Sequence, residues 1–358
     1  MKLNWLSEFL ANIVNASAIT EAVTRPFIGL RQQLTPSSIY CLIKSSSAEA
    51  LEHILIACAV YLLVCLGLYK LTFWLSAAAT ATAAASPSDA RNSNNNNNNS
   101  SSNNSSGSGE SGLRNALQCG LRSVHLPKAA FMGRVLLVIA HPDDECMFFG
   151  PLIYTLTQRD GCQVYVLCLS NGNYEQKGQV RRDELYRACK RLGICESNII
   201  LVNATNLPDD PNVEWRSDAV ASFILHTVES LDIQAIFTFD RDGVSSHPNH
   251  CAVYYAAASL CLANLLPKGC KFYTLDSINL VRKYLSIFDL LCTCFMSSHW
   301  CILSWKDASI VRSAMMEHQS QLKWFRWLYI YTSRYMFINS IREINLSDIE
   351  LEMQIHDN

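Results

Sequence analysis

The sequence lacks several patterns that mark common kinds of protein. None of its fifteen cysteines forms a Cys-x-x-Cys pair, which excludes a zinc site built from paired cysteines. No Gly-x-Gly-x-x-Gly follows the first apolar strand, which disfavours a dinucleotide-binding domain. The formal net charge is only −2, so there is no basic excess and we expect no nucleic-acid partner. The cysteines are odd in number, and we interpret them as small buried side chains in a reducing compartment.

Residues 1–50 also lack the basic segment and the early apolar core of a cleaved signal peptide. A long apolar run begins later: residues 54–69 carry no charge, and the run continues beyond Lys70. Crossing a hydrocarbon core of ~30 Å takes about 20 residues. We therefore predict a single transmembrane helix over residues 51–76, with the Lys70 side chain reaching toward the interface. The alternative is a long helix buried in a soluble domain.

Composition divides the chain into five parts. Residues 1–50 are an N-terminal extension, and residues 51–76 are the transmembrane helix. Residues 77–130 are rich in Ala, Ser and Asn, have little to bury, and are expected to form a disordered linker. Residues 131–345 are expected to form the catalytic domain, followed by a C-terminal tail at 346–358.

From residue 134 onward, apolar strand patterns alternate with helix patterns. This alternation predicts an α/β fold: a Rossmann-like, open and mostly parallel sheet with helices on both faces, preceded by the single transmembrane helix. Most of the strands are apolar throughout, as strands buried on both faces should be. The predicted strands are 135–140, 164–169, 199–202, 235–239 and 272–275, and the predicted helices lie near 147–159, 179–192, 217–230 and 249–264.

Two clusters of metal-binding residue types follow predicted strands. The first strand runs directly into His141-Pro-Asp143-Asp144-Glu145, and His247-Pro-Asn-His250 follows the fourth. Because the carboxyl ends of parallel strands open onto one crevice, we expect the clusters to meet there. Each alone has an ordinary alternative, an acidic helix start or a chance histidine pair. Together they predict a His/Asp/His site for a divalent metal, which indicates a zinc hydrolase.

With these clusters, the chain resembles the PIG-L/LmbE-like family of zinc-dependent N-acetylglucosaminyl deacetylases. The resemblance is closest to the membrane branch, the N-acetylglucosaminyl-phosphatidylinositol de-N-acetylases of glycosylphosphatidylinositol (GPI) anchor synthesis. It covers roughly residues 134–340. The further motifs, which follow one another in the right order, are Ser170-Asn-Gly-Asn173-Tyr174, Arg181-Arg-Asp-Glu184-Leu, Leu207-Pro-Asp-Asp-Pro211, Phe239-Asp240, Ser320-Gln-Leu-Lys-Trp324-Phe-Arg326 and Ser333-Arg334-Tyr335-Met336.

The resemblance implies a role for each residue of the two clusters. His141, Asp144 and His250 would bind the metal, Zn²⁺ or another divalent ion. Asp143 would take the proton of the attacking water, and His247 would stabilise the oxyanion or protonate the departing amine. The residue types alone leave Asp143 and Asp144 interchangeable, so this division of roles rests on the resemblance.

The chain departs from the family at one position, because many bacterial relatives have an acid where it has Asn249. An acid there could orient the catalytic imidazole of His247. We expect Asp240 to take over this task, with Asp242 as the alternative candidate; both are equally well interpreted as acids of a polar loop. Glu145 is predicted to support the site, as a helix cap or as a hydrogen-bond partner of the site residues.

Two residues are predicted to contact the substrate. Asn173 follows the second strand and would bind sugar hydroxyls. The guanidinium of Arg181 suits a phosphate and would bind that of the inositol phosphate. The alternative for Arg181 is an ion pair with Glu184 on the same helix.

The resemblance implies a single-pass enzyme of the endoplasmic reticulum membrane whose catalytic domain faces the cytosol. It would hydrolyse the acetamide of N-acetylglucosaminyl-phosphatidylinositol, a glycolipid partner in the membrane; no protein partner can be inferred. The alternatives are a deacetylase of another N-acetylated glycan or glycoside, and an inactive membrane scaffold. The complete metal and base set argues against the scaffold. Finally, the apolar residues 284–303 and the aromatic residues 324–329 either pack in the core or lean into the bilayer.

Overall fold

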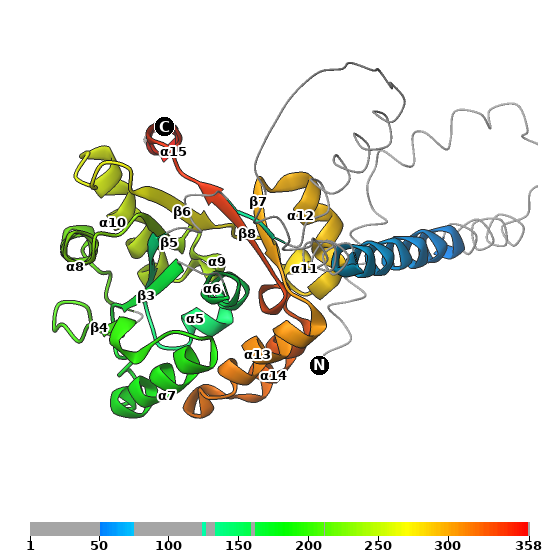
Figure 1. Ribbon diagram of the computed structural model, residues 1–358, viewed down its shortest axis with the longest axis horizontal. Helices are drawn as coiled ribbons and strands as arrows, with labels where there is room; N and C mark the ends of the chain where they lie inside the picture. Colours follow the sequence, from blue (N-terminus) through cyan, green and yellow to red (C-terminus); the bar gives the residue numbers. More distant parts are fainter. Residues whose placement is uncertain (1–50, 75–123, 127–132, 159–161, 211, 357–358) are drawn as a thin grey trace, which may run out of the picture. The chain divides into compact units, whose positions relative to one another are not determined.

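A computed structural model describes residues 51–74, 124–126, 133–158, 162–210 and 212–356 (Figure 1). The predicted N-terminal extension, residues 1–50, lies outside the described residues. The predicted linker, residues 77–130, also lies outside them except for 124–126. Val124–His125 form a short strand, β1, which joins the sheet. The sheet therefore begins before the expected domain boundary at residue 131. The sequence did not reveal this strand, because two residues are too few to show a pattern.

The described chain forms one eight-stranded sheet, in the order β1-β7-β8-β6-β5-β2-β3-β4. Five neighbouring strands are parallel, and β8 runs antiparallel to both β6 and β7. The expected fold class, a mostly parallel sheet with helices on both faces, is confirmed. The strands are β2 (Gly133–Ile139), β3 (Cys162–Cys168), β4 (Ile199–Leu201), β5 (Ala235–Phe239), β6 (Lys271–Leu275), β7 (His299–Ile302) and β8 (Ile338–Glu343).

Both faces of the sheet are buried, which explains why its strands are apolar without alternation. Along β2, Val135, Leu137 and Ile139 belong to one core cluster, whereas Leu136 and Val138 belong to the other. Successive side chains of a strand point to opposite faces, so a central strand needs apolar residues at every position. The five strands predicted from this pattern are the five parallel strands.

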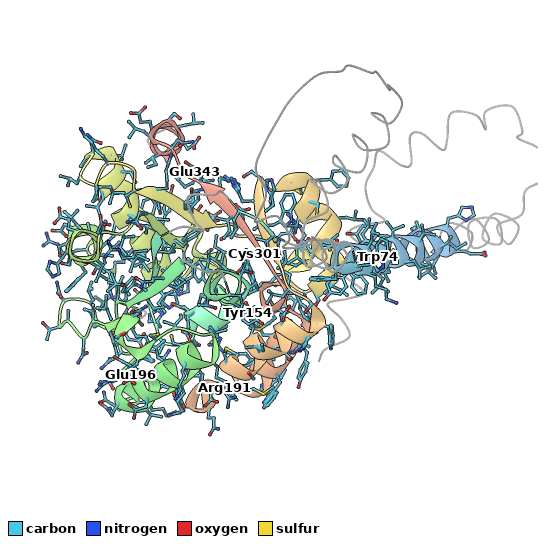
Figure 2. The ribbon with its side chains drawn as sticks, in the orientation of Figure 1. Trp74, Tyr154, Arg191, Glu196, Cys301 and Glu343 are labelled. Atoms are coloured by element: carbon cyan, nitrogen blue, oxygen red, sulfur yellow. The ribbon has the colours of Figure 1, made fainter. Side chains whose placement is uncertain are left out.

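Helices cover each face. The first core cluster contains residues of α6 (Gly150–Thr157), α7 (Gly178–Arg191) and α13 (Trp305–Met315), and the second those of α8 (Ser217–Leu231), α10 (Pro248–Leu262) and α15 (Leu346–His356). The Tyr154 hydroxyl of α6 donates to Asp307 of α13 at 3.1 Å (Figure 2). The remaining elements are α5 (Asp144–Met147), η3 (Glu196–Asn198), α9 (Gly243–Ser246), α11 (Leu280–Lys283), η4 (Ser286–Asp289), α12 (Leu290–Met296), η5 (Gln319–Gln321), α14 (Trp324–Thr332) and η6 (Arg334–Met336).

Three details differ from the sequence predictions. The helix predicted near 147–159 is two helices, α5 and α6. The chain turns at Phe148 and Phe149, and α6 begins at Gly150 with Pro151 in its first turn, where proline is tolerated. The strands β7 and β8 were not predicted. The expected tail, residues 346–358, begins with α15, and its Ile349 is buried against the second core cluster.

The cysteines of the core agree with the sequence interpretation. Cys146, Cys168 and Cys189 are fully buried free thiols. Burial raises the pKa of each of these thiols well above its ordinary value. Such thiols pack as small apolar side chains.

A single described helix, Leu51–Trp74, is long and apolar enough to cross a membrane. Its most apolar 18-residue window has a mean hydropathy of 2.3, and only 6% of that window is buried. From Leu62 onward the helix belongs to the same compact unit as the sheet. The Tyr69 hydroxyl donates to the carbonyl oxygen of Leu303, which follows β7, at 3.0 Å.

Candidate active site and metal centre

The two histidine clusters meet beyond the carboxyl ends of β2 and β5. These parallel strands are neighbours in the sheet, and the chain leaves them in opposite directions, toward β3 and β4 on one side and β6 on the other. Loops at such a reversal of strand order form the ligand crevice of open α/β sheets. The loop after β2 supplies His141, Asp143 and Asp144, and the start of α10 supplies His250. The expectation that the clusters converge is confirmed.

Asp144 and His250 form the inner part of the site. Both are buried, and Nε2 of His250 lies 3.3 Å from Oδ1 of Asp144. The other carboxylate oxygen of Asp144 accepts the backbone N–H groups of Ala140 and His141, at 3.1 and 2.8 Å. Nδ1 of His250 lies 2.9 Å from the carbonyl oxygen of Gly243. With Nδ1–H donated there, Nε2 faces Asp144: it is free to bind a metal when His250 is neutral, and it donates to the carboxylate when His250 is protonated.

The electrostatics favour a neutral His141 and an ionised Asp144, the states that metal ligands take, but they favour the protonated form of His250. Burial lowers the pKa of His141 to about 4, so its imidazole is neutral at physiological pH, as a metal ligand must be. Burial also raises the pKa of Asp144, but the charge of His250 and its hydrogen bond to Asp144 outweigh this effect and lower the pKa overall. Burial lowers the pKa of His250, but the attraction of Asp144 raises it overall. Asp144 is therefore ionised.

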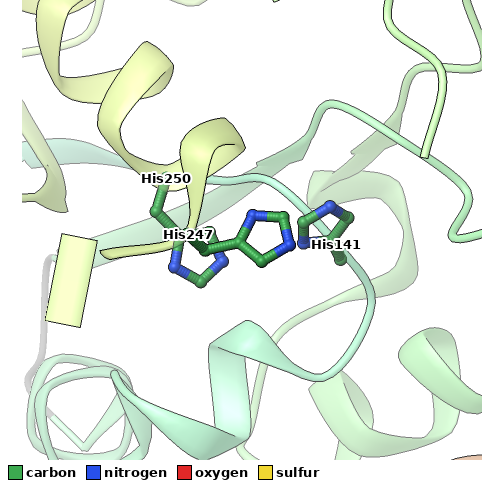
Figure 3. A group of neighbouring side chains, drawn as sticks. All are labelled: His141, His247 and His250. Carbon is green, nitrogen blue, oxygen red and sulfur yellow. The ribbon is translucent and has the colours of Figure 1, made fainter. Parts of the chain in front are cut away.

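Three imidazoles surround one space (Figure 3). One nitrogen from each of His141, His247 and His250 lies within 4.8 Å of the corresponding nitrogens of the other two. Nδ1 of His141 lies 3.8 Å from a carboxylate oxygen of Asp144, and its Nε2 lies 2.9 Å from the side-chain nitrogen, Nδ2, of Asn249. His247 thus belongs to the same candidate metal-binding group as the predicted ligands His141 and His250, and its role as a catalytic residue stays a prediction.

The donor set fits a divalent metal. Two ligand atoms that each lie ~2.0–2.1 Å from a tetrahedral zinc are roughly 3.3 Å apart. The distance between His250 Nε2 and Asp144 Oδ1 is 3.3 Å, and the histidine that supplies the third predicted ligand, His141, is neutral. Each of these side chains is also held by a further hydrogen bond from its other polar atom, the arrangement that orients metal ligands.

Asp143 is held in an unusual conformation beside these ligands. Its φ is 121°, which costs a residue with a side chain roughly 1–3 kcal/mol. Its carboxylate is buried and lies 3.0 Å from Arg326 and 3.9 Å from Arg181. Burial raises the pKa of Asp143, and the positive charge of Arg326 partly counters that rise. A carboxylate with a raised pKa is a better general base near neutral pH than an exposed one.

Glu145 hydrogen-bonds to the backbone of Asp143 and has a second partner that the sequence did not reveal. One oxygen of Glu145 accepts the backbone N–H of Asp143 at 3.0 Å, and the other lies 2.6 Å from Nε2 of His318. The side chains of Glu145 and His318 are both fully buried. Burial lowers the pKa of His318, but the attraction of Glu145 raises it overall. The two therefore form a buried ion pair that fixes the backbone at Asp143.

Asp240 has a different partner from the one expected. Its two oxygens accept the backbone N–H and the hydroxyl of Ser277, at 2.6 and 2.5 Å. The same hydroxyl accepts the backbone N–H of Val244, whose φ is 60°. Nδ1 of His247 instead accepts the backbone N–H of Asn249 at 3.2 Å. Asp240 thus holds the strained loop that leads to His247, and a direct contact with the imidazole is not among the described hydrogen bonds.

A pocket of about 250 Å³ opens in front of the site. Arg181 lines it, whereas the side chain of Asn173 is exposed and accepts the N–H of Gly178 at the start of α7. Arg181 is held by Asp209, at 3.3 Å, rather than by the Glu184 of its own helix. Glu184 accepts the N–H and hydroxyl of Ser320. The lining residues are Tyr174, Glu175, Lys177, Arg181, Asp209, His247, Ser320, Gln321, Lys323, Phe325 and Arg326.

Three residues of this site were not singled out by the sequence prediction. Asp209 lies 3.3 Å from both His141 and Arg181. Arg326 contacts Asp143, and His318 contacts Glu145. Asp209 and Arg326 belong to stretches that carried the family resemblance, so those motifs were a usable signal. His318 follows α13 and stands outside every quoted motif, so no local pattern marked it.

Comparisons with known proteins place this geometry in context. The family model PIG-L, described as GlcNAc-PI de-N-acetylase, matches residues 136–261. The N-acetylglucosaminyl-phosphatidylinositol de-N-acetylase of Bos taurus is 46% identical over 209 residues, which cover 58% of this chain and 82% of that protein. Proteins named probable N-acetylglucosaminyl-phosphatidylinositol de-N-acetylase from Schizosaccharomyces pombe and Dictyostelium discoideum are 38% and 34% identical, over 58% and 59% of this chain and 86% and 93% of those proteins.

Proposed function

The chain belongs to the PIG-L family of N-acetylglucosaminyl-phosphatidylinositol de-N-acetylases, and from this premise we propose that it hydrolyses the acetamide of N-acetylglucosaminyl-phosphatidylinositol. The products are acetate and glucosaminyl-phosphatidylinositol, an early intermediate of GPI-anchor synthesis. One observation carries the proposal: a neutral His141, an ionised Asp144 and His250 converge beside a second, buried aspartate whose partner Arg326 lines the pocket.

His141, Asp144 and His250 would hold the metal, Zn²⁺ being the ion that this donor set suits. When bound, such an ion polarises the acetamide carbonyl and lowers the pKa of water toward neutrality. Asp143 accepts the proton from the attacking water, for which its raised pKa and its place beside Asp144 are suitable. Arg326 keeps its carboxylate in place.

His247 is the histidine that lines the open pocket, so it faces the substrate. Burial, followed by the nearby His250, lowers the pKa of His247. Its imidazole donates a hydrogen bond to the oxyanion of the tetrahedral intermediate or protonates the departing amine. Both tasks require a position next to the scissile bond, on the side opposite the base.

The charge of the pocket suits a phosphorylated substrate. Two acids line it, Glu175 and Asp209. Four cationic side chains also line it: Lys177, Arg181, Lys323 and Arg326. Arg181 is the candidate for the inositol phosphate, because a guanidinium matches phosphate oxygens in a fork geometry. Asn173 is exposed near the pocket and is retained as a sugar contact.

The helix Leu51–Trp74 supports a single-pass membrane protein, which suits a lipid-linked substrate. We assign it to the endoplasmic reticulum membrane, with the catalytic domain on the cytosolic side, as the family resemblance implies. The metal, the compartment and the orientation are all parts of this proposal.

The test is acetate release from N-acetylglucosaminyl-phosphatidylinositol in membranes that carry the full chain. Asp143→Ala removes the base and should lower the rate by about 10²–10⁴-fold. Chelation should abolish acetate release in the unmodified protein, and added zinc should restore it. Asp218→Ala is a matched control, because Asp218 is an exposed acid of α8 that does not line the pocket.

The outcomes separate the alternatives. Acetate release that depends on both Asp143 and the metal supports the proposal. Metal bound without acetate release from this lipid, but with release from another N-acetylated sugar, would assign a different substrate. A protein that binds no metal and releases no acetate would be the inactive scaffold.

A further inference from the structure

The helix α14 has two faces with different surroundings. Tyr329 and Ile330 are buried, and the Tyr329 hydroxyl donates to the carbonyl oxygen of Met147 at 2.7 Å. Arg326 points inward and contacts Asp143. The opposite side, here called the outer aromatic face, is formed by side chains that are 42–80% exposed: Trp324, Trp327, Leu328 and Tyr331. Large apolar side chains grouped in this way mark a surface that meets another phase or molecule.

The apolar surface continues onto neighbouring elements. Lys283 of α11 lies over the ring of Tyr329, at 5.6 Å from its centroid, which places α11 against α14. Arg282 contacts the sulfur of Met296 at the end of α12. Exposed apolar side chains project from both elements: Leu280 and Val281 of α11, and Phe295 and Met296 of α12, between 71% and 86% exposed.

The composition of this surface matches a membrane interface. Tryptophan and tyrosine are the residues enriched where hydrocarbon meets headgroups, and lysine and arginine accompany them on surfaces that face anionic lipids. Neither α11 nor the segment 323–332 contains an acidic residue, and Lys283 is a cation of this surface. The other cations of these segments have acidic partners: Arg282 pairs with Asp289, Lys323 with Glu175 and Arg326 with Asp143. The exposed aromatic and aliphatic side chains, rather than an excess of charge, therefore indicate a membrane interface.

The surface is also continuous with the candidate membrane span. Within the compact unit that begins at Leu62, Cys65 of the apolar helix contacts the carbonyl oxygen of Phe288 in η4 at 3.4 Å. The segment η4 directly precedes α12, and Tyr69 contacts Leu303 beyond β7. The exposed apolar ends of α11 and α12 thus lie next to elements that contact the span.

We propose that α14, with α11 and the end of α12, rests in the lipid interface and delivers the membrane-bound substrate to the active site. Phe325 and Arg326 line the pocket, while Trp324 and Leu328, on the same helix, face outward. A glycolipid whose tails stay in the bilayer therefore meets the pocket mouth where α14 enters the interface. This inference rests on the proposed function, because it assumes a lipid-linked substrate.

The test uses the full chain reconstituted in vesicles of phosphatidylcholine and phosphatidylinositol. The variant Trp324→Ser/Leu328→Ser removes two outward side chains that do not line the pocket and are 80% and 55% exposed. Its matched control is Leu265→Ser/Leu351→Ser, two residues of similar exposure, 53% and 59%, after α10 and on α15. Each protein is assayed on N-acetylglucosaminyl-phosphatidylinositol in the vesicles and on a short-chain analogue that is soluble in water.

We expect kcat/KM on the vesicle substrate to fall about tenfold in the Trp324→Ser/Leu328→Ser variant and to stay unchanged in the control. Activity on the soluble analogue should be the same in all three proteins, which a misfolded variant would not give. Equal activity of variant and unmodified protein on both substrates would overturn the inference, as would an equal loss on both. No activity of the unmodified protein on either substrate would instead refute the proposed function.

A second measurement does not depend on turnover. Vesicles that contain brominated phosphatidylcholine quench tryptophans that reach the acyl chains. The conservative variant Trp324→Phe/Trp327→Phe should lose part of the quenching seen in the unmodified protein. Unchanged quenching would mean that α14 stays out of the bilayer, and a protein-binding role for this surface would then replace the one proposed.

Discussion

The pair formed by His318 and Glu145 yields the sharpest prediction about how this active site is held together. Replacement of His318 by alanine removes the cation from a carboxylate that lies 2.6 Å away and has no exposed surface. Glu145 also accepts the N–H of Asp143, so the change acts on the strained backbone of the proposed base. We expect the variant to lose both stability and activity.

The magnitude follows from burial. Removal of one partner of a fully buried ion pair costs about 3–5 kcal/mol, because the remaining charge is left without compensation. That is a large fraction of the roughly 5–15 kcal/mol by which folded domains are stable. For a domain of this size the midpoint of thermal unfolding should fall by about 6–20 °C. Acetate release, measured well below that midpoint, should fall about 10–100-fold, as expected for a residue that orients the catalytic ones.

The loss should depend on pH in a defined direction. The pKa of His318 in the folded protein is raised above its ordinary value of 6.5. The stabilisation is therefore complete below the unfolded pKa and is lost as the pH rises through the folded one. The difference in unfolding midpoint between the unmodified protein and His318→Ala should be largest below pH 6.5 and should shrink as the pH rises through the raised pKa of His318.

Two further variants decide whether this reasoning holds. His318→Gln keeps a hydrogen-bond donor but no charge and should lie between the other two proteins. His226→Ala removes an exposed histidine of α8 and should change stability by no more than about 0.5 kcal/mol. A loss in His318→Ala no larger than that in His226→Ala, or one that does not vary with pH, would show that the buried pair is not ionised.

Two more predictions concern the metal and the fold. Asp144→Asn should lower the affinity for zinc by at least about 100-fold in a competition with a chromogenic chelator, whereas Asp218→Asn, which changes an exposed acid of α8, should bind zinc normally. Asp289→Asn should destabilise the protein by about 3–5 kcal/mol in thermal unfolding, because it weakens the contact to Arg334, 2.7 Å away and fully buried. The exposed pair of Lys271 with Glu343 should contribute only about 0–1 kcal/mol when it is removed.

The sequence by itself determined the parallel half of the sheet. Strands such as β2 and β5 are buried on both faces, so each is an uninterrupted apolar run that stands out from the helices around it. The convergence of His141 to Asp144 with His250 followed from the same fact, because neighbouring parallel strands end at one edge. These are local patterns combined with one rule of topology, and both can be read without coordinates.

Elements with weaker local signals needed the tertiary structure. The strand β7 is only four residues long and follows the apolar helix α12 after two residues. The two elements therefore look like one apolar stretch in the sequence, with no separate strand pattern. The outward side of α14 is as aromatic as its buried side, and only packing shows that Tyr329 and Ile330 face the core while Trp324 faces solvent. Sequence composition could not choose between a core helix and a membrane-facing one.

The partners of the charged residues were likewise decided by the fold. Arg181 could pair with Glu184 on its own helix, but the loop after β4 brings Asp209 closer. His318 and Arg326 reach Glu145 and Asp143 across more than 170 residues of sequence. The sequence determines which charged side chains the protein has. Because charges attract one another through space and most strongly when they are buried, the folded structure determines which of these side chains form pairs.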